Sequence, residues 1–227
     1  MADGTVTSRS ERVVAACAAE LSRSAAVRFV REATDGTVDD DAFAAYLAIE
    51  ERFVRTATRV TGYLVWASSD WTESAAHARN VGALVGEQLD WFHRVRLRWP
   101  GGAARVADAV SRSEPLTEHV LRLTTEHGAP AALTAMLAAE TLYAGWCGRA
   151  AALPVERFAD LREWIDLHAA STFTDGVRAL SAAVDAIPPS VTDEQIVGWF
   201  RGTLAAEDVF HDAVYPLEPP PPVPLTR

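Results

Sequence analysis

Apolar residues recur along this chain at helical rather than strand spacing. Alanine, leucine and arginine dominate, and the alternation of apolar and polar residues that is typical of half-buried strands is nearly absent. The pattern predicts helices over about residues 8–32, 41–67, 73–99, 103–111, 116–127, 131–152, 155–185 (broken near 166–171) and 192–215. Because the loops are short and no repeat of fixed period occurs, we expect one all-α domain, a multi-helix bundle.

Capping signals support several of these helix ends. The expected N-caps are Asp39 or Asp40, Asp70 or Thr72, and Thr192, which begins a capping box with Gln195. The segment WPGG is expected to end the helix before it. The prediction is therefore a helical domain over residues 1–215, followed by a proline-rich tail, 216–227, that cannot continue the last helix.

Composition narrows the classes of partner. The formal net charge is −10, which argues against a nucleic-acid surface. Every basic residue is arginine, so Schiff-base lysine chemistry and a P-loop lysine are excluded. We expect no signal peptide, no membrane partner and a cytoplasmic location. Cys17 and Cys147 lie in alanine-rich helical sequence and are expected to be small core residues rather than a disulfide.

Three carboxylates stand in apolar helical surroundings. Glu140 is the one charged side chain in the run Ala129–Gly148, and Glu50 and Glu207 have similar settings. A buried carboxylate is costly unless it has a partner, a raised pKa or a chemical task. The three acids indicate a polar pocket inside the bundle. The alternative is that they form structural ion pairs with arginines.

Helical spacing places other reactive side chains beside these acids. Glu207 shares a face with Phe210 and His211, a pairing suited to proton transfer or metal binding, or simply a Glu–His contact. Tyr143 follows Glu140 by three residues and offers a hydroxyl donor. Phe53 follows Glu50 at the same spacing.

Two further expectations concern neighbouring positions. Of the adjacent Glu50 and Glu51, one is expected to face solvent, and Glu50 is the better candidate for burial. His168 can point inward, although a lone histidine is more often a satisfied structural residue.

Three segments together resemble the TenA/THI-4 family, a branch of the heme-oxygenase-like helical fold. They are FVREATDGTVDDDAFAAYLAIEERFV, MLAAETLYAGW and LAAEDVFHDAVY, in that order and with matching spacing. The positions in register in the first segment are Phe29, Gly36, Thr37, Phe43, Tyr46 and Leu47. The resemblance implies a heme-oxygenase-like (TenA-like) bundle that forms a homodimer or homotetramer and takes a small-molecule heterocycle.

The resemblance also implies roles for single residues. Glu50 falls on the pyrimidine-binding aspartate of the family, Phe53 on its stacking aromatic, and Glu207 on its proton-handling glutamate. Tyr143, His168 and Phe210 fall on further site positions of the family. Their own helical settings add His211 as a substrate-binding residue and Glu140 as a second catalytic acid or base. The position of the nucleophilic cysteine holds Ala139.

The missing cysteine shapes the expected function. We expect a TenA-like enzyme that binds or hydrolyses an aminopyrimidine-like, thiamin-related heterocycle by carboxylate acid–base catalysis, without a cofactor. One alternative is a non-haem oxidase of the same fold, with iron or another transition metal at Glu50, Glu140, His168, Glu207 and His211. The other is a non-catalytic ligand-binding or regulatory homologue.

Overall fold

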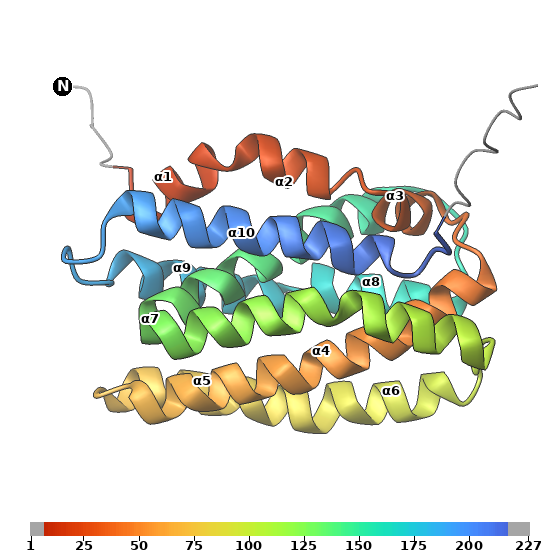
Figure 1. The fold of residues 1–227 in the computed structure, drawn as a ribbon, viewed down its shortest axis with the longest axis horizontal. Helices are drawn as coiled ribbons and strands as arrows, with labels where there is room; N and C mark the ends of the chain where they lie inside the picture. Colours follow the sequence, from red (N-terminus) through yellow and green to blue (C-terminus); the bar gives the residue numbers. More distant parts are fainter. Residues whose placement is uncertain (1–6, 218–227) are drawn as a thin grey trace, which may run out of the picture.

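A computed structural model describes residues 7–217, and this part of the chain contains helices and no strand. The predicted all-α bundle is confirmed. The helices lie along one long axis in layers, with α10 against α7, α7 against α4, and α4 against α5 (Figure 1). The bounds are α1 Arg9–Ala16, α2 Ala18–Ser24, α3 Arg28–Asp35, α4 Asp40–Ala67, α5 Trp71–Ala83, η1 Leu84–Gln88, α6 Leu89–Arg96, α7 Ala103–Ala152, α8 Ala159–Ala169, α9 Ser171–Asp185 and α10 Asp193–Asp212.

The central helix α4 begins where its cap was predicted. The Asp39 side chain accepts a hydrogen bond from the amide of Ala42. From Ala42 to Phe53 nearly every α4 residue is buried, as expected of a helix that is covered on all sides. Asp70 caps α5, and Thr192 forms the predicted capping box with Gln195.

Two predicted helices are divided differently in the structure. The single helix expected over residues 8–32 is three helices, α1, α2 and α3, with breaks at Cys17 and at Ala25–Val27. The helix expected from residue 155 begins at Ala159, because Arg157 is buried and donates hydrogen bonds to the carbonyls of Ala33 and Thr34. The break between α8 and α9, at Ala170, lies where it was predicted.

Two other regions are more continuous than predicted. The three short helices expected between residues 103 and 152 merge into α7, which keeps Pro115 inside it and changes direction at Gly128. The predicted helix 73–99 runs through α5, η1 and α6, and η1 is a π-helical turn. Single π-turns inside α-helices are frequent at functional sites.

The core lies between α4, α7, α8 and α10. Cys17 and Cys147 are buried and free, so the prediction of core cysteines is confirmed. No helix among residues 7–217 is both long enough and apolar enough to cross a membrane. The expected tail begins at residue 216 and lies almost entirely outside the described residues.

Candidate functional site

Three helices bring four of the predicted site residues together in the core. Glu50 comes from α4, Tyr143 from α7, and Glu207 and His211 from α10. All four are buried, and the exposed fractions of Glu207 and His211 are 1% and 0%. Each faces inward because apolar neighbours one turn away on its helix anchor the same face in the core. These four residues are called the inner cluster below.

The hydroxyl of Tyr143 joins the inner cluster. It donates a hydrogen bond to Oε2 of Glu50 at 2.7 Å. It also lies 3.1 Å from the hydroxyl of Tyr46, which accepts a hydrogen bond from the indole of Trp164 at 2.9 Å. Nε2 of His211 is 3.4 Å from the same Tyr143 oxygen. A chain of polar contacts therefore runs through the core from Trp164 to Glu50, with a branch to His211.

Glu207 is a buried acid without a hydrogen-bond partner. Within residues 7–217, neither carboxyl oxygen of Glu207 has one. Nδ1 of His211 is 3.8 Å from Oε2 and instead makes a 2.9 Å contact with the backbone carbonyl of Glu207. Burial, followed by the charges of Glu50 and Glu140, raises the pKa of Glu207 well above its usual range. Burial therefore favours the neutral, protonated form of this carboxyl.

Burial shifts the other titratable groups of the core in the same sense, toward the neutral form. It raises the pKa of Glu50 to about 7, while hydrogen bonds from Tyr143 and Tyr46 oppose the shift. It lowers the pKa values of His168 and His211 to about 4, so both imidazoles are neutral at pH 7. The inner cluster thus contains acids whose protons can move near neutral pH, the property that general acid–base catalysis requires.

The predicted aromatic residues surround this cluster. Phe53 and Phe210 pack against each other with ring centroids 5.8 Å apart. His168 packs on Trp164 at 4.1 Å and on Tyr143 at 5.3 Å, and its Nδ1 lies 2.8 Å from the Trp164 carbonyl oxygen. The structure therefore brings all three residues to the cluster, and His168 has the satisfied contacts of a structural histidine.

Glu51 does not behave as expected. The prediction that Glu50 or Glu51 faces solvent is wrong, because Glu51 is also buried, at 9% exposure. Ion pairs with Arg55 and Arg96, both at 2.7 Å, hold its carboxylate and lower its pKa against the effect of burial.

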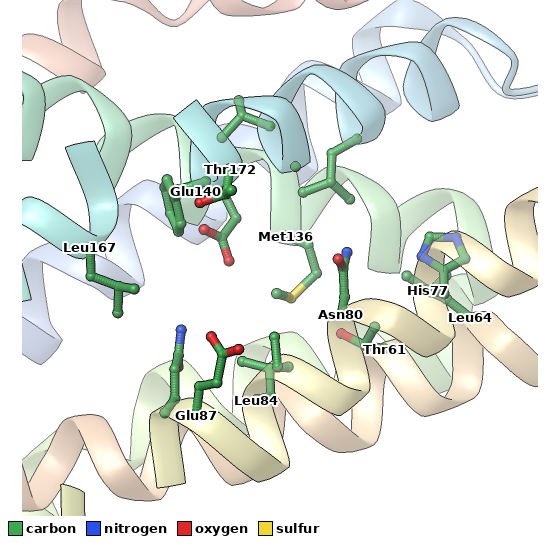
Figure 2. A pocket seen from close by; sticks show the side chains of 16 residues that line it. Thr61, Leu64, His77, Asn80, Leu84, Glu87, Met136, Glu140, Leu167 and Thr172 are labelled. Atoms are coloured by element: carbon green, nitrogen blue, oxygen red, sulfur yellow. The ribbon is translucent and has the colours of Figure 1, made fainter. Parts of the chain in front are cut away.

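Glu140 lines a cavity of about 210 Å³, which none of the four residues of the inner cluster lines. Figure 2 shows the Glu140 carboxyl directed into this space, across from Glu87 of η1. Glu140 is half-buried, and burial followed by repulsion from Glu50 raises its pKa to about 8. No arginine among residues 7–217 pairs with Glu140, so the structure does not support the alternative of a structural ion pair for this acid.

The remaining cavity wall was not predicted from the sequence. It is formed by α4, α5, η1, α7, α8 and α9, and its other polar residues are Thr61, His77, Asn80, Gln88 and Thr172. A signal was available in the sequence: His77, Asn80, Leu84 and Glu87 follow each other at spacings of three and four residues. This spacing places them on one helix face, as Glu207 and His211 are placed on another.

Metal and thiol chemistry find little support in the geometry. Across residues 7–217, no group of three or more His, Cys, Asp and Glu side chains is arranged to hold a metal ion, and this includes the five alternative ligands named above. Ala139, where the resemblance would place a cysteine, is buried. Burial raises the pKa of the Cys147 thiol well above its usual range, and so keeps it in the unreactive thiol form.

The fold and site together define a heme-oxygenase-like helical bundle with a carboxylate-lined cavity. The chain belongs to the TENA/THI-4/PQQC family, whose sequence profile matches residues 28–216. No curated protein sequence gives a significant match.

Solved structures confirm the fold. A TenA homologue from Pyrococcus furiosus superposes with a TM-score of 0.75 at 16% identity, over 91% of this chain and 100% of that one. A protein described as a TenA family transcription regulator, from a Silicibacter species, gives 0.73 at 18%, over 92% and 95%. A protein described as a putative TenA-like thiaminase, from Sulfolobus solfataricus, gives 0.70 at 16%, over 90% and 94%.

Proposed function

We propose that this protein is a TenA-family hydrolase that cleaves a small, thiamin-related aminopyrimidine by carboxylate acid–base catalysis. The observation that supports this most is the position of Glu140. It faces the cavity, and it lies close enough to Glu50 of the inner cluster for the charge of Glu50 to raise its pKa. The TenA-like thiaminase description of the Sulfolobus neighbour supports the thiamin-related substrate class.

The proposed reaction is hydrolysis of a carbon–nitrogen bond. Glu140, which is protonated at neutral pH, gives its proton to the leaving nitrogen as the bond breaks. The oxygen of water bonds to the carbon, and a proton from this water returns to Glu140. This hydrolysis needs no covalent enzyme intermediate, so it does not require a cysteine at position 139.

The inner cluster has a supporting role in this proposal. Glu207 does not line the cavity, so its part in proton transfer runs through His211, Tyr143 and Glu50 rather than through direct contact with the ligand. The contacts between these groups span 2.7 to 3.8 Å, which small side-chain movements can shorten to hydrogen bonds. Ring stacking on Phe53 and Phe210 stays a prediction, and it requires the two rings to separate.

The direct test is turnover of two substrates, 4-amino-5-aminomethyl-2-methylpyrimidine and its N-formyl derivative. Release of ammonia or formate is the readout. We expect Glu140→Gln to lower kcat/KM by about 100-fold or more, because removing a positioned acid or base typically costs that much. Asp90→Asn, which removes an exposed acid on α6 outside the cavity, is the matched control.

Glu207→Gln tests the relay. We expect lower kcat at nearly unchanged KM, because Glu207 does not touch the cavity. Wild-type turnover in Glu207→Gln removes Glu207 from the mechanism. Loss of turnover in Asp90→Asn as well shows that the assay follows net charge rather than the site.

A non-catalytic binding protein is the second candidate, and the buried Ala139 at the cysteine position favours it. The description of the Silicibacter neighbour as a transcription regulator is consistent with such a role. Calorimetry with an aminopyrimidine alcohol tests this candidate. Binding of the alcohol without turnover of either substrate favours a non-catalytic binding protein over an enzyme.

A further inference from the structure

Two carboxylates face the same cavity from different helices. Glu140 lies on the α7 side, half-buried, and Glu87 lies at the exposed rim on η1. Within residues 7–217, neither has a hydrogen bond or an ion pair with another side chain, and no arginine lines the cavity. The chain has no lysine and a net charge of −10, which favours a positively charged ligand at these acids.

A third polar group of the wall also has no partner. His77 lines the cavity from α5, is 9% exposed, and makes no hydrogen bond within the described part of the chain. Its ring nitrogens are not among the fully buried side-chain atoms that lack a partner, so they are accessible to water or to a ligand in the cavity. Burial lowers the pKa of His77, which leaves one ring nitrogen as donor and the other as acceptor.

The wall gives the cavity two polar ends and an apolar middle. Along α5 and η1, His77, Asn80, Leu84 and Glu87 occupy successive turns, and a rise of about 1.5 Å per residue puts His77 and Glu87 about 15 Å apart. Figure 2 shows the same order: Glu87 and Glu140 lie at one end of the cavity, and Asn80 and His77 lie toward the other end. Leu84 and Met136 lie between the two ends. The π-turn η1 widens the helix where Glu87 and Gln88 reach the cavity.

We propose that this cavity binds a small organic cation, a protonated primary amine or an amidinium, between Glu87 and Glu140. Its apolar body lies against Leu84 and Met136, and a hydrogen-bonding group at its other end reaches Asn80 and His77. The volume of about 210 Å³ is below the ~300–1,000 Å³ that drug-sized ligands occupy, so the ligand is small. Phosphorylated ligands are rejected, because no arginine lines the described cavity wall to offset their charge.

This inference deepens the proposed function by giving the substrate a positive charge. The bound amine then already carries the proton that Glu140 supplies to the leaving nitrogen in the proposed reaction, and Glu140 holds the amine as a carboxylate. The inference rests on the proposed function only for the reaction, not for binding. Binding is therefore tested first with a pair of probes that the proposed reaction does not consume, and then with a pair that carries the substrate ring. Benzylamine and benzyl alcohol have the same number of heavy atoms and differ in charge at neutral pH. Aminomethylpyrimidine and hydroxymethylpyrimidine repeat the comparison on the proposed ring. Calorimetry on the full chain gives the four dissociation constants.

We expect each amine to bind about tenfold or more tightly than its alcohol, the factor that one charge-assisted hydrogen bond provides. Glu140→Gln abolishes the preference for the amine, and Glu87→Gln, at the exposed rim, reduces it several-fold. Asp90→Asn, with the same loss of charge one turn beyond Glu87, keeps it. Because Glu87 is exposed, Glu87→Gln is expected to fold even if Glu140→Gln does not, and circular dichroism checks both.

The outcomes separate this inference from the proposed function. The cation site is overturned if amine and alcohol bind equally, or if neither amine binds up to about 10 mM. It is also overturned if the preference for the amine survives in a variant that combines Glu87→Gln with Glu140→Gln. A phosphate ester that binds as tightly as the amine also overturns it. Amines that bind selectively but are never hydrolysed refute the proposed reaction and leave the cation site standing.

Discussion

At the scale of single residues, Glu140 is expected to lower stability at neutral pH. Its pKa rises from 4.5 in the unfolded chain to about 8 in the folded protein, so the native state holds the proton more tightly. The free energy of unfolding therefore falls as pH rises from about 4.5 to about 8. Glu140→Gln does not lose stability in this way, so it should be more stable than the wild type at pH 8 by on the order of 1–2 kcal/mol. This value is smaller than the full pKa shift implies, because the carboxyl opens onto a cavity in which solvent screens its charge.

Thermal melts at pH 5 and pH 8 measure this difference. The gain should shrink at pH 5, where the native state keeps the proton and the unfolded wild-type chain is already partly protonated. Asp90→Asn, which removes an exposed acid outside the cavity, is the control variant. A Glu140→Gln protein that is less stable at both pH values shows that the carboxylate has a structural partner.

Tyr143 is expected to act in the opposite direction, because its hydroxyl stabilises the charged form of Glu50. Tyr143→Phe removes the 2.7 Å hydrogen bond, which typically stabilises a charged acceptor by about 1.5–3 kcal/mol. The pKa of Glu50 is about 7, so the loss should be larger at pH 8 than at pH 5.

Denaturant titrations at the two pH values test the Tyr143 prediction. Tyr63→Phe on α4 is the control, since the Tyr63 hydroxyl has no hydrogen bond in the described residues. An equal loss at both pH values contradicts the assigned coupling between Tyr143 and Glu50.

At the scale of helices, Gly128 is the clearest case of a required glycine. It interrupts α7 with φ 70° and ψ −156°, a conformation that is almost restricted to glycine. A Cβ atom would meet no atom closer than 3.4 Å, so the strain is conformational rather than steric. We expect Gly128→Ala to cost about 1–3 kcal/mol.

The control for Gly128 comes from a glycine inside a regular helix. Gly198 lies in α10 with open space around it, and Gly198→Ala should stabilise the protein by about 0.5–1 kcal/mol. Chemical denaturation of the two variants measures both values. A Gly128→Ala protein as stable as wild type shows that the bend in α7 relaxes without cost.

Helix boundaries were predictable where the signal is local. Asp39, Asp70 and Thr192 accept hydrogen bonds from backbone amides two or three residues away, so a short window contains the information. The late start of α8 at Ala159 was not predictable in this way. It depends on Arg157 reaching carbonyl groups of α3, more than a hundred residues earlier. The opposite error occurred at Pro115: the sequence predicted a break between two helices there, but α7 continues through this proline.

At the scale of the whole molecule, the sequence identified which acids are unusual but not which space each one faces. Helical spacing brought Glu207 and His211 together correctly, and the family resemblance placed Glu50 and Tyr143 with them. Glu140 was grouped with them, yet it faces the cavity, because the direction of a side chain depends on how α7 packs between α4 and α10. Glu87 was missed because its significance arises only when η1 stands across from α7.

The expected homo-oligomer stays a prediction. Light scattering of the purified protein should give two or four times the chain mass of 24.5 kDa. The side chains of Trp66 and Trp71 are 80% and 88% exposed, and burying such large apolar surfaces favours association. A monomer at all concentrations contradicts the prediction.

The acidic balance of the whole chain leads to the last prediction, that this protein does not bind nucleic acid directly. Affinity for a phosphate backbone comes from unpaired basic side chains that displace counterions. Here the net charge is −10, and many arginines are already neutralised, as in the pairs of Arg9 with Asp193, Arg94 with Glu163 and Arg201 with Glu20. A gel-shift titration with duplex DNA and with single-stranded RNA should show no complex at physiological salt. Any weak band at low salt should vanish as salt rises, and a complex that persists at physiological salt would contradict the prediction.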